Sequence, residues 1–224
     1  MDIAVIIPTL NEGKNLKTLI PAIHCVLEEA YIIVIVDDDS KDNTQYLIDC
    51  IEMTYPVKLI VRKDKRGLAS AVIDGLNYMK ADAYIVMDAD FSHPPELLSK
   101  MRDALQDYDL VVASRHVIGG GIENWPLRRR IISQGAIILA RPLTPIKDTT
   151  TGFFGIKAHC LNGVDLTPIG YKIGLEVFVR ANWQTCLEIP FIFTDRANGQ
   201  SKMGKKQMVQ YLKQLAQLYK YHWS

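Results

Sequence analysis

The stretch "YIIVIVDDDS", residues 31–40, joins an apolar run directly to three aspartates and a serine. The apolar part is rich in β-branched residues and continuous rather than alternating, which is typical of a strand that other elements cover on both faces. Similar runs occur at residues 3–8, 57–61, 83–87 and 110–113. Each of them is bounded by polar or turn residues. We therefore expect a set of buried strands, several of which end in charged side chains.

Segments with helical spacing lie between these runs. They cover residues 15–30, 43–53, 67–79 and 94–106. The alternation of strand and helix predicts an α/β fold with a mostly parallel central sheet and right-handed crossovers. Ligands of such sheets bind beyond the carboxyl ends of the strands. The residues that follow each strand are thus the first candidates for a site.

Charged side chains gather at the five predicted strand ends. They are Glu12, Asp37, Asp38, Asp39, Arg62, Asp88, Asp90 and Arg115. A helix cap accounts for one of three successive aspartates, but not for all of them. In a nucleotide-binding interpretation, an aspartate at this position accepts hydrogen bonds from the base or from ribose hydroxyls. We call the edge of the sheet at which these strands end the rim. If the rim only terminated the strands, so many charged side chains would not be needed there.

The stretch "VMDADFSHPPE", residues 86–96, places two aspartates one residue apart after a strand. One carboxylate can bind a divalent cation while the other orients a sugar, and Mg²⁺ needs few protein carboxylates when phosphate oxygens complete its shell. Such an ion would neutralise a diphosphate leaving group. Alone, this pattern is weak evidence for a metal site, because many strands end in acidic turns. For His93 we expect a structural hydrogen bond and no catalytic role.

After residue 115 the regular alternation stops. Residues 127–140 indicate an amphipathic helix that begins with three arginines, a placement that the helix dipole disfavours unless an anion lies in front of them. A solvated basic face is the alternative. We expect further elements as follows: a helix at 174–183, a strand at 185–193 and a helix at 205–224. The loop at 195–204 is either a flap that carries positive charge to phosphate or an ordinary polar loop.

Composition excludes several classes of protein. With 224 residues, 48% of them hydrophobic, the chain can bury a large core, and its net charge of +1 gives no overall field for nucleic acid. The four cysteines form no CxxC pair, so we expect them to be reduced and mostly buried. No signal peptide is evident, and no run approaches the roughly 20 apolar residues of a membrane span.

Seven motifs in order carry a resemblance to a known family. They are "IIPTLNE", "VDDDS", "VMDADFSHPPE", "SRHVIGGGIENWPLRRRIIS", "DTTTGFF", "GYKIGLE" and "DRANGQSKMG". The chain resembles the dolichyl-phosphate mannosyltransferases, which are inverting family-2 glycosyltransferases of GT-A fold, from about residue 3 to about residue 215. The first and third motifs are shared widely among family-2 enzymes. The arginine helix and the last motif are specific to the polyprenyl-phosphate branch.

The resemblance implies a single GT-A domain over residues 1–224. Residues 1–115 would form its nucleotide-binding half, 116–205 its acceptor-binding half and flap, and 206–224 a C-terminal helix that is a candidate for the membrane interface. The implied reaction moves mannose from GDP-mannose to dolichyl or another polyprenyl phosphate, with inversion and with Mg²⁺ or Mn²⁺. The acceptor implies a peripheral position on the cytoplasmic face of a membrane. Some relatives add transmembrane helices after this point, and others use an anchoring partner.

The resemblance also assigns residues by matching position. For the donor they are Pro8, Glu12, Val36, Asp38, Asp88, Ala89, Asp90, Arg196 and Lys202. For the acceptor phosphate they are Arg115, Arg129 and Ser133, and for the metal they are Asp90 and Ser92. The catalytic groups would be Asp90, Arg115 and Arg129. Relatives usually have tyrosine in place of Leu10 and glutamine in place of Ser92, which leaves base stacking and metal choice open.

Two rival functions remain at this level. The nearer is transfer of glucose or another sugar from a UDP- or GDP-sugar on the same scaffold, because donor choice depends on the shape of the pocket. The more distant is a nucleotide-binding module without catalysis, against which the intact "DAD" argues.

Overall fold

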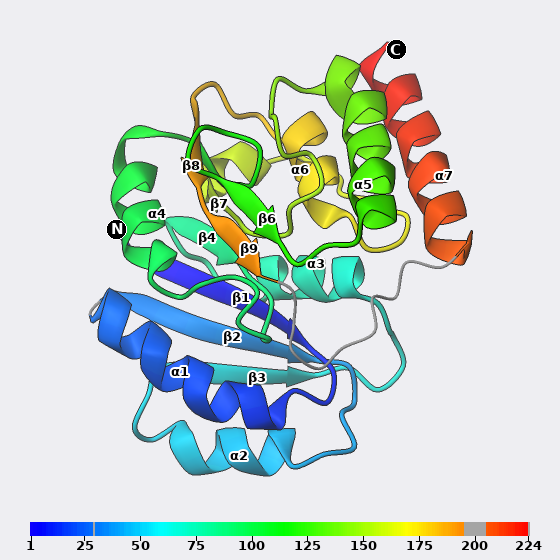
Figure 1. Ribbon diagram of the computed structural model, residues 1–224. Helices are drawn as coiled ribbons and strands as arrows, with labels where there is room; N and C mark the ends of the chain where they lie inside the picture. Colours follow the sequence, from blue (N-terminus) through cyan, green and yellow to red (C-terminus); the bar gives the residue numbers. More distant parts are fainter. Residues whose placement is uncertain (29, 195–204, 224) are drawn as a thin grey trace.

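The computed structural model describes residues 1–28, 30–194 and 205–223. Its first half alternates strands and helices, as expected (Figure 1). The elements are β1 (Ile3–Thr9), α1 (Gly13–Leu27), β2 (Tyr31–Asp37), α2 (Thr44–Ile51), β3 (Val57–Val61), α3 (Leu68–Tyr78), β4 (Ala83–Val86), α4 (Leu97–Asp107) and β5 (Leu110–Ser114).

The second half is less regular. Its elements are β6 (Gly121–Glu123), α5 (Leu127–Ala140), the 3-10 helix η1 (Arg141–Leu143), β7 (Phe154–Lys157), the 3-10 helix η2 (Ala158–Leu161), α6 (Ile173–Arg180), β8 (Cys186–Pro190), β9 (Ile192–Thr194) and α7 (Lys205–His222). The helices predicted at 127–140, 174–183 and 205–224 are present with small shifts of their ends.

One seven-stranded sheet organises the molecule, in the order β3-β2-β1-β4-β7-β5-β8. All neighbouring pairs are parallel except those of β7, which is antiparallel to both β4 and β5. The predicted α/β class with a mostly parallel sheet is therefore confirmed. The antiparallel strand β7 was not predicted. Because it runs the other way, the chain that leads into it arrives at the carboxyl ends of β4 and β5.

Helices cover both faces of this sheet. Alternate residues of β1 point to opposite sides: Val5 packs in a core with α1 and α4, and Ile6 packs in a second core with α3 and α6. At Gly75 an added Cβ would lie 2.5 Å from Ile6 Cγ2, so the glycine permits the close approach of α3 to β1. The continuous apolar runs in the sequence reflect this coverage. The edge strand β3 is an exception, since most of it is only half-buried.

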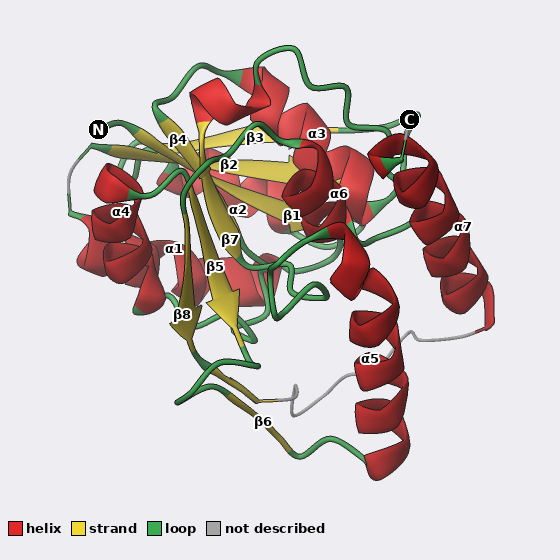
Figure 2. Cartoon of the chain, turned by 90° about the horizontal axis from the view of Figure 1, so that it is seen from above, coloured by secondary structure: helices red, strands yellow, loops and turns green. Residues whose placement is uncertain are grey.

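The prediction of one continuous strand at 185–193 was wrong, because this segment forms two strands, β8 and β9. After Pro190 the chain leaves the large sheet, and Ile192–Thr194 pair with Gly121–Glu123 in a two-stranded sheet. The backbone N–H of Phe191, at the junction, still donates to Ser114 O at 3.1 Å. Figure 2 shows β6 beyond the ends of β5 and β8. The small sheet therefore extends the edge at which the candidate site lies.

The C-terminal helix α7 packs on the end of α5, on η1 and on α6. Tyr211, Leu215 and Leu218 form a third apolar cluster there. The Tyr211 hydroxyl donates to Ala136 O at 2.7 Å. The N-terminal part of α5 extends away from the main sheet (Figure 2). Among the described residues, no helix is both long and apolar enough to cross a bilayer.

The cysteines are free, as expected. The expectation that they are mostly buried was wrong, because Cys25 and Cys50 are exposed.

Candidate active site

The residues predicted to bind the donor lie at the ends of β1, β2 and β4. Pro8 and Val36 are register partners on neighbouring strands, and the Asp38 N–H donates to Thr9 O at 2.9 Å. The N–H of Met87 donates to Ile6 O at 3.1 Å, so Asp88 emerges beside the end of β1. The structure thus brings together residues that the resemblance assigns to base and ribose. Their roles stay a prediction.

Two of the acidic residues after β2 have bonds within the protein. Asp37 is fully buried and accepts hydrogen bonds from the backbone N–H and the hydroxyl of Ser40. Asp38 accepts from both the Nε and an Nη of Arg62, and its second oxygen accepts the Gly67 N–H at 2.8 Å. Asp37 therefore has a structural role in the turn, while Asp38 is held rigidly at the rim.

The loop after β1 is shaped by short local bonds. The Asn11 N–H donates to Ser40 Oγ at 2.7 Å, and Glu12 accepts from Asn15 Nδ2 at 2.5 Å. Leu10, where relatives usually have an aromatic ring, is 41% exposed at the edge. An exposed apolar side chain there is compatible with contact to a base.

The turn after β4 orients its carboxylates through backbone groups. Asp90 Oδ1 accepts the Ser92 N–H at 2.9 Å, and Phe91 between them has a left-handed φ of 61°. The Asp88 N–H donates to His93 Nδ1 at 2.9 Å, and the buried imidazole stacks on Phe153. Burial lowers the pKa of His93, so the ring is neutral and accepts this bond. The structural role expected for His93 is confirmed.

The donor atoms at this turn suit a divalent cation. Asp88 and Asp90 are half-buried carboxylates, and the hydroxyl of the buried Ser92 adds a further oxygen. Hard cations such as Mg²⁺ and Mn²⁺ prefer oxygen ligands. Asp90 and Ser92 as ligands stay a prediction, with Asp90 the better supported because its carboxylate is already oriented.

A second cluster of metal-ligand types is less suited to an ion. Asp109, His159 and Cys160 lie together at the other end of the sheet. The ammonium of Lys157 is 3.7 Å from Asp109 Oδ1 and would repel a cation. Burial and the charge of Asp109 raise the pKa of the Cys160 thiol to about 11, which opposes the thiolate that metals bind. We interpret this cluster as structural.

The residues predicted to hold the acceptor phosphate include one member of a buried ion pair. Arg115 Nε and Nη2 each donate to Asp148 at 2.7 Å, and the Arg115 N–H donates to the same carboxylate at 2.9 Å. Nη2 also donates to Thr150 Oγ1 at 2.8 Å. Burial alone would raise the pKa of Asp148, but the bonds and charge of Arg115 outweigh it and hold that pKa below its ordinary value. Sequence reasoning missed Asp148, although its motif was noted.

An indole links the two arginines that were predicted to hold phosphate. The guanidinium carbon of Arg129 lies 3.9 Å from the centre of the Trp125 ring, and that of Arg115 lies 5.7 Å from it. Trp125 also contacts Phe193 edge to face. Sequence reasoning missed this tryptophan, whose signal was its place directly before the arginine helix. The structure thus brings Arg115 and Arg129 into one cluster.

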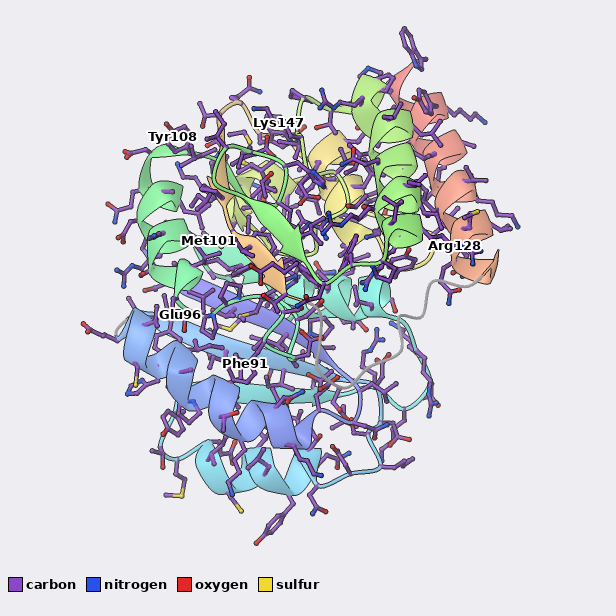
Figure 3. All side chains as sticks on the ribbon, in the orientation of Figure 1. Phe91, Glu96, Met101, Tyr108, Arg128 and Lys147 are labelled. Atoms are coloured by element: carbon purple, nitrogen blue, oxygen red, sulfur yellow. The ribbon has the colours of Figure 1, made fainter. Side chains whose placement is uncertain are left out.

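A cavity of about 200 Å³ lies beside this cluster. Its lining residues are Arg115, His116, Ile122, Arg130, Ser133 and Gln134. Two of the three predicted acceptor residues therefore line one cavity, where Arg130 joins them. Arg128, labelled in Figure 3, is exposed at the start of α5. Of the three arginines, Arg128 and Arg130 are exposed and Arg129 is half-buried, so a solvated basic face describes part of the triplet. Arg196 and Lys202 lie outside the described residues.

Comparison with known proteins identifies the family of the chain. Residues 4–163 match the family model described as glycosyl transferase family 2. A glucosyl-3-phosphoglycerate synthase from Mycobacterium tuberculosis, solved with Mn²⁺, UDP and glucosyl-3-phosphoglycerate, has a TM-score of 0.72 over 99% of this chain and 80% of that one. At 16% identity this likeness shows the fold alone. The chain is a member of glycosyl transferase family 2.

Sequence relatives narrow the family further. A dolichol-phosphate mannosyltransferase from Pyrococcus furiosus is 42% identical over 99% of this chain, which spans 64% of that protein's length. Another from Mycosarcoma maydis is 37% identical over 97% of this chain and 79% of the relative. Within family 2, the chain belongs to the dolichol-phosphate mannosyltransferases, as its motifs indicated.

Proposed function

We propose that this chain transfers mannose from GDP-mannose to dolichyl or another polyprenyl phosphate with inversion, giving dolichyl β-D-mannosyl phosphate and GDP. The observation that carries the proposal is the division of this edge of the sheet between the carboxylates after β4, of which Asp90 is oriented by the Ser92 N–H, and the buried and half-buried cations Arg115 and Arg129. The names of the relatives support a mannosyl donor and a polyprenyl phosphate acceptor.

The chemistry needs no dedicated general base. A polyprenyl phosphate is already an anion near neutral pH, so its oxygen can attack C1 of mannose while the C1–O bond to GDP breaks. The obstacle is repulsion between two phosphate groups that must approach each other. Arg115 and Arg129 would hold the acceptor phosphate and offset its charge, and Asp38 and Asp88 would orient the donor. Positioning and charge compensation of this kind lower the barrier.

A divalent cation would complete the donor side. Asp90, together with the Ser92 hydroxyl, would hold Mg²⁺ or Mn²⁺. When bound, such an ion stabilises the negative charge that develops on the departing diphosphate. The bond from the Ser92 N–H to Asp90 fixes one carboxylate oxygen in advance, which reduces the ordering that binding requires.

We also propose that α5 rests on a membrane surface, because the acceptor is a lipid. Leu127, Ile131 and Ile138 are 73%, 63% and 66% exposed, and their spacing puts them on one side of the helix. The exposed Arg128 and Arg130 lie at the same end and suit anionic headgroups. In this arrangement the chain binds peripherally, on the cytoplasmic face, with or without an anchoring partner.

The transfer is tested with detergent-solubilised protein, dolichyl phosphate and radiolabelled donor. We expect labelled lipid from GDP-mannose in the presence of Mg²⁺ or Mn²⁺, and none after chelation. UDP-glucose is run in parallel. Product from UDP-glucose in place of GDP-mannose would replace the proposed donor, and product without any divalent cation would contradict the metal site.

Membrane contact is tested by flotation with vesicles that contain anionic lipid. A variant with Leu127, Ile131 and Ile138 changed to serine should float much less than the wild type. The control changes Met53, which is 96% exposed two residues after the end of α2, to serine. Equal loss in both variants, or no loss in the first, would argue against α5 as the membrane face.

A further inference from the structure

Strand β8 carries one charged side chain in the apolar run "CLEIPFIF", and neither the fold nor the proposed mechanism has so far given it a task. Glu188 is half-buried on this strand, and Val112 of β5 is its register partner. The neighbours of Glu188 show the alternation of a strand, because Cys186 packs against one core and Ile189 against the other. Glu188 therefore lies on the same face as Cys186, on the edge strand of the large sheet.

The carboxylate of Glu188 binds two successive backbone N–H groups of the loop that leads into β7. The N–H of Lys147 donates to Oε2 at 3.0 Å, and the N–H of Asp148 donates to Oε1 at 3.2 Å. Hydrogen bonds to an ionised acceptor are stronger than those between neutral groups. Because each oxygen accepts a different N–H, the two bonds fix the direction of this part of the loop as well as its position.

Asp148 is held at the same time by the neighbouring strand. Its carboxylate accepts from the N–H of Arg115 at 2.9 Å and from the Nε and Nη2 of that residue at 2.7 Å each. Arg115 follows β5 directly, and β5 is the parallel neighbour of β8. The backbone of Asp148 is therefore fixed by a side chain of β8, and its carboxylate by the residue after β5. If the loop moved away from β8, the carboxylate that orients the Arg115 guanidinium would move with it.

Asp109 makes the same kind of contact at the opposite end of these two strands. Its Oδ2 accepts the N–H of Gln184 at 3.0 Å and that of Thr185 at 3.1 Å, directly before β8. Its other oxygen lies 3.7 Å from the ammonium of Lys157. Asp109 thus anchors β8 by two backbone bonds, as Glu188 anchors the loop, but it does so far from Arg115. It provides a matched comparison for a role in stability alone.

We propose that Glu188 is a positioning residue for the acceptor phosphate: it holds the backbone of Asp148, and through Asp148 it fixes the guanidinium of Arg115. This inference rests on the proposed function, since there Arg115 binds the phosphate of a polyprenyl phosphate. A carboxylate suits the task because both of its oxygens accept. In glutamine, an amino group would replace one oxygen and would face a backbone N–H, donor against donor.

The test measures binding of farnesyl phosphate, its neutral counterpart farnesol, and GDP with Mn²⁺ to the full chain by calorimetry. The variants are Glu188→Gln and Glu188→Ala, and the control is Asp109→Ala, which also removes two bonds to backbone N–H groups. Glu188 and Lys147 line a cavity of about 390 Å³. Because water in this cavity can bind a freed N–H, we expect both Glu188 variants to fold.

We expect both Glu188 variants to weaken farnesyl phosphate binding about tenfold or more, because a small displacement of a binding group has effects of this size. Farnesol and GDP binding should be unchanged. Asp109→Ala should lower the melting temperature but bind farnesyl phosphate like the wild type. Wild-type affinity for farnesyl phosphate in Glu188→Ala would overturn the inference, as would an equal loss in Asp109→Ala or a loss shared by GDP.

A double-mutant cycle tests whether Glu188 acts through Asp148. The partner variant is Asp148→Asn, which keeps one acceptor oxygen for Arg115. If Glu188 acts through this residue, adding Glu188→Gln to Asp148→Asn should weaken farnesyl phosphate binding much less than Glu188→Gln does alone. If the two losses multiply, Glu188 acts independently of Asp148 and the inference fails. The results for the single Glu188 variants hold whether or not Asp148→Asn folds.

The same experiment separates this inference from the proposed function. If the wild type transfers mannose and the Glu188 variants bind farnesyl phosphate normally, the inference fails and the function stands. If the wild type transfers no mannose but its farnesyl phosphate binding depends on Glu188, the function fails and the positioning role stands. If the wild type binds no farnesyl phosphate at all, both fail.

Discussion

Two buried arginines, one on each side of the rim, have opposite surroundings. Arg62, after β3, lies between two carboxylates: it binds Asp38 and is 3.1 Å from Asp74. Arg115, after β5, binds the single carboxylate of Asp148 and has further cations near it, Lys172 and Arg129. The first side is therefore rich in hydrogen-bond acceptors, and the second is rich in positive charge.

This contrast fits the two kinds of ligand that the site is proposed to hold. Ribose hydroxyls and the ring N–H of a base donate hydrogen bonds, so acceptors suit them. A phosphate only accepts, so donors and cations suit it. A charged residue at a strand end is thus informative only together with its partners, since Asp37, Asp38 and Asp90 look alike in the sequence but have different bonds.

The largest expected effect distinguishes a carboxylate that is proposed to act in the reaction from one that stabilises the fold. Asp90→Asn should lower mannosyl transfer about a hundredfold or more through loss of the ion that stabilises the leaving group, with an unchanged melting temperature. Asp37→Asn should instead lower the stability, by about 1–3 kcal/mol, because its buried bonds to Ser40 are weakened. Activity assays and thermal melts of both variants check this, and full activity of Asp90→Asn would remove Asp90 from the metal site.

The next effect compares the two ion pairs directly. Asp148→Ala should cost about 3–5 kcal/mol of unfolding free energy, because it leaves Arg115 buried next to other cations. Asp38→Ala should cost less, about 1–3 kcal/mol, because Arg62 keeps Asp74 as a partner. Urea unfolding of both variants measures the difference. Equal losses would mean that the surplus of cations around Arg115 does not matter for stability.

The smallest effect concerns pH. The pKa of Lys172 is about 8 in the folded protein against an ordinary value of 10.5, so the folded state releases this proton first as pH rises. The cost of the buried charge is complete below pH 8 and is lost between pH 8 and 10.5. Relative to Lys172→Met, the wild type should therefore gain stability over that range. Melting temperatures of the pair at several pH values test the sign, and a relative loss would contradict it.

Much of the fold could be predicted because both faces of β1, β2, β4 and β5 are covered. Their residues must all be apolar, and a continuous run ended by charges is easy to recognise. Strand β7 was missed because it has only the four residues Phe154–Lys157, one of which is a glycine. Strands β8 and β9 were joined because nothing in "CLEIPFIF" marks the point at which the chain changes sheets.

Site residues could be predicted where they follow a strand directly. They were harder to predict where their place depends on a partner that is distant in the sequence. Arg115 could be proposed from its place after a strand, but Asp148 lies far along the chain, and only the antiparallel entry into β7 brings it close. The ammonium of Lys172 could not be placed near this pair for the same reason, since its bond to Thr150 O, 2.6 Å long, depends on the packing of α6. Contacts between distant segments carry no local pattern in one sequence.

The position of β7 also sets an order for synthesis. When residues 1–115 have left the ribosome, every strand assigned to the nucleotide half has been made, yet β4 and β5 are not neighbours in the finished sheet. Each has an unpaired edge until residues 154–157 emerge and fit between them. The sheet therefore cannot be continuous between β4 and β5 until residues 154–157 pair there, and the segment that leads into β7 brings Asp148 to Arg115.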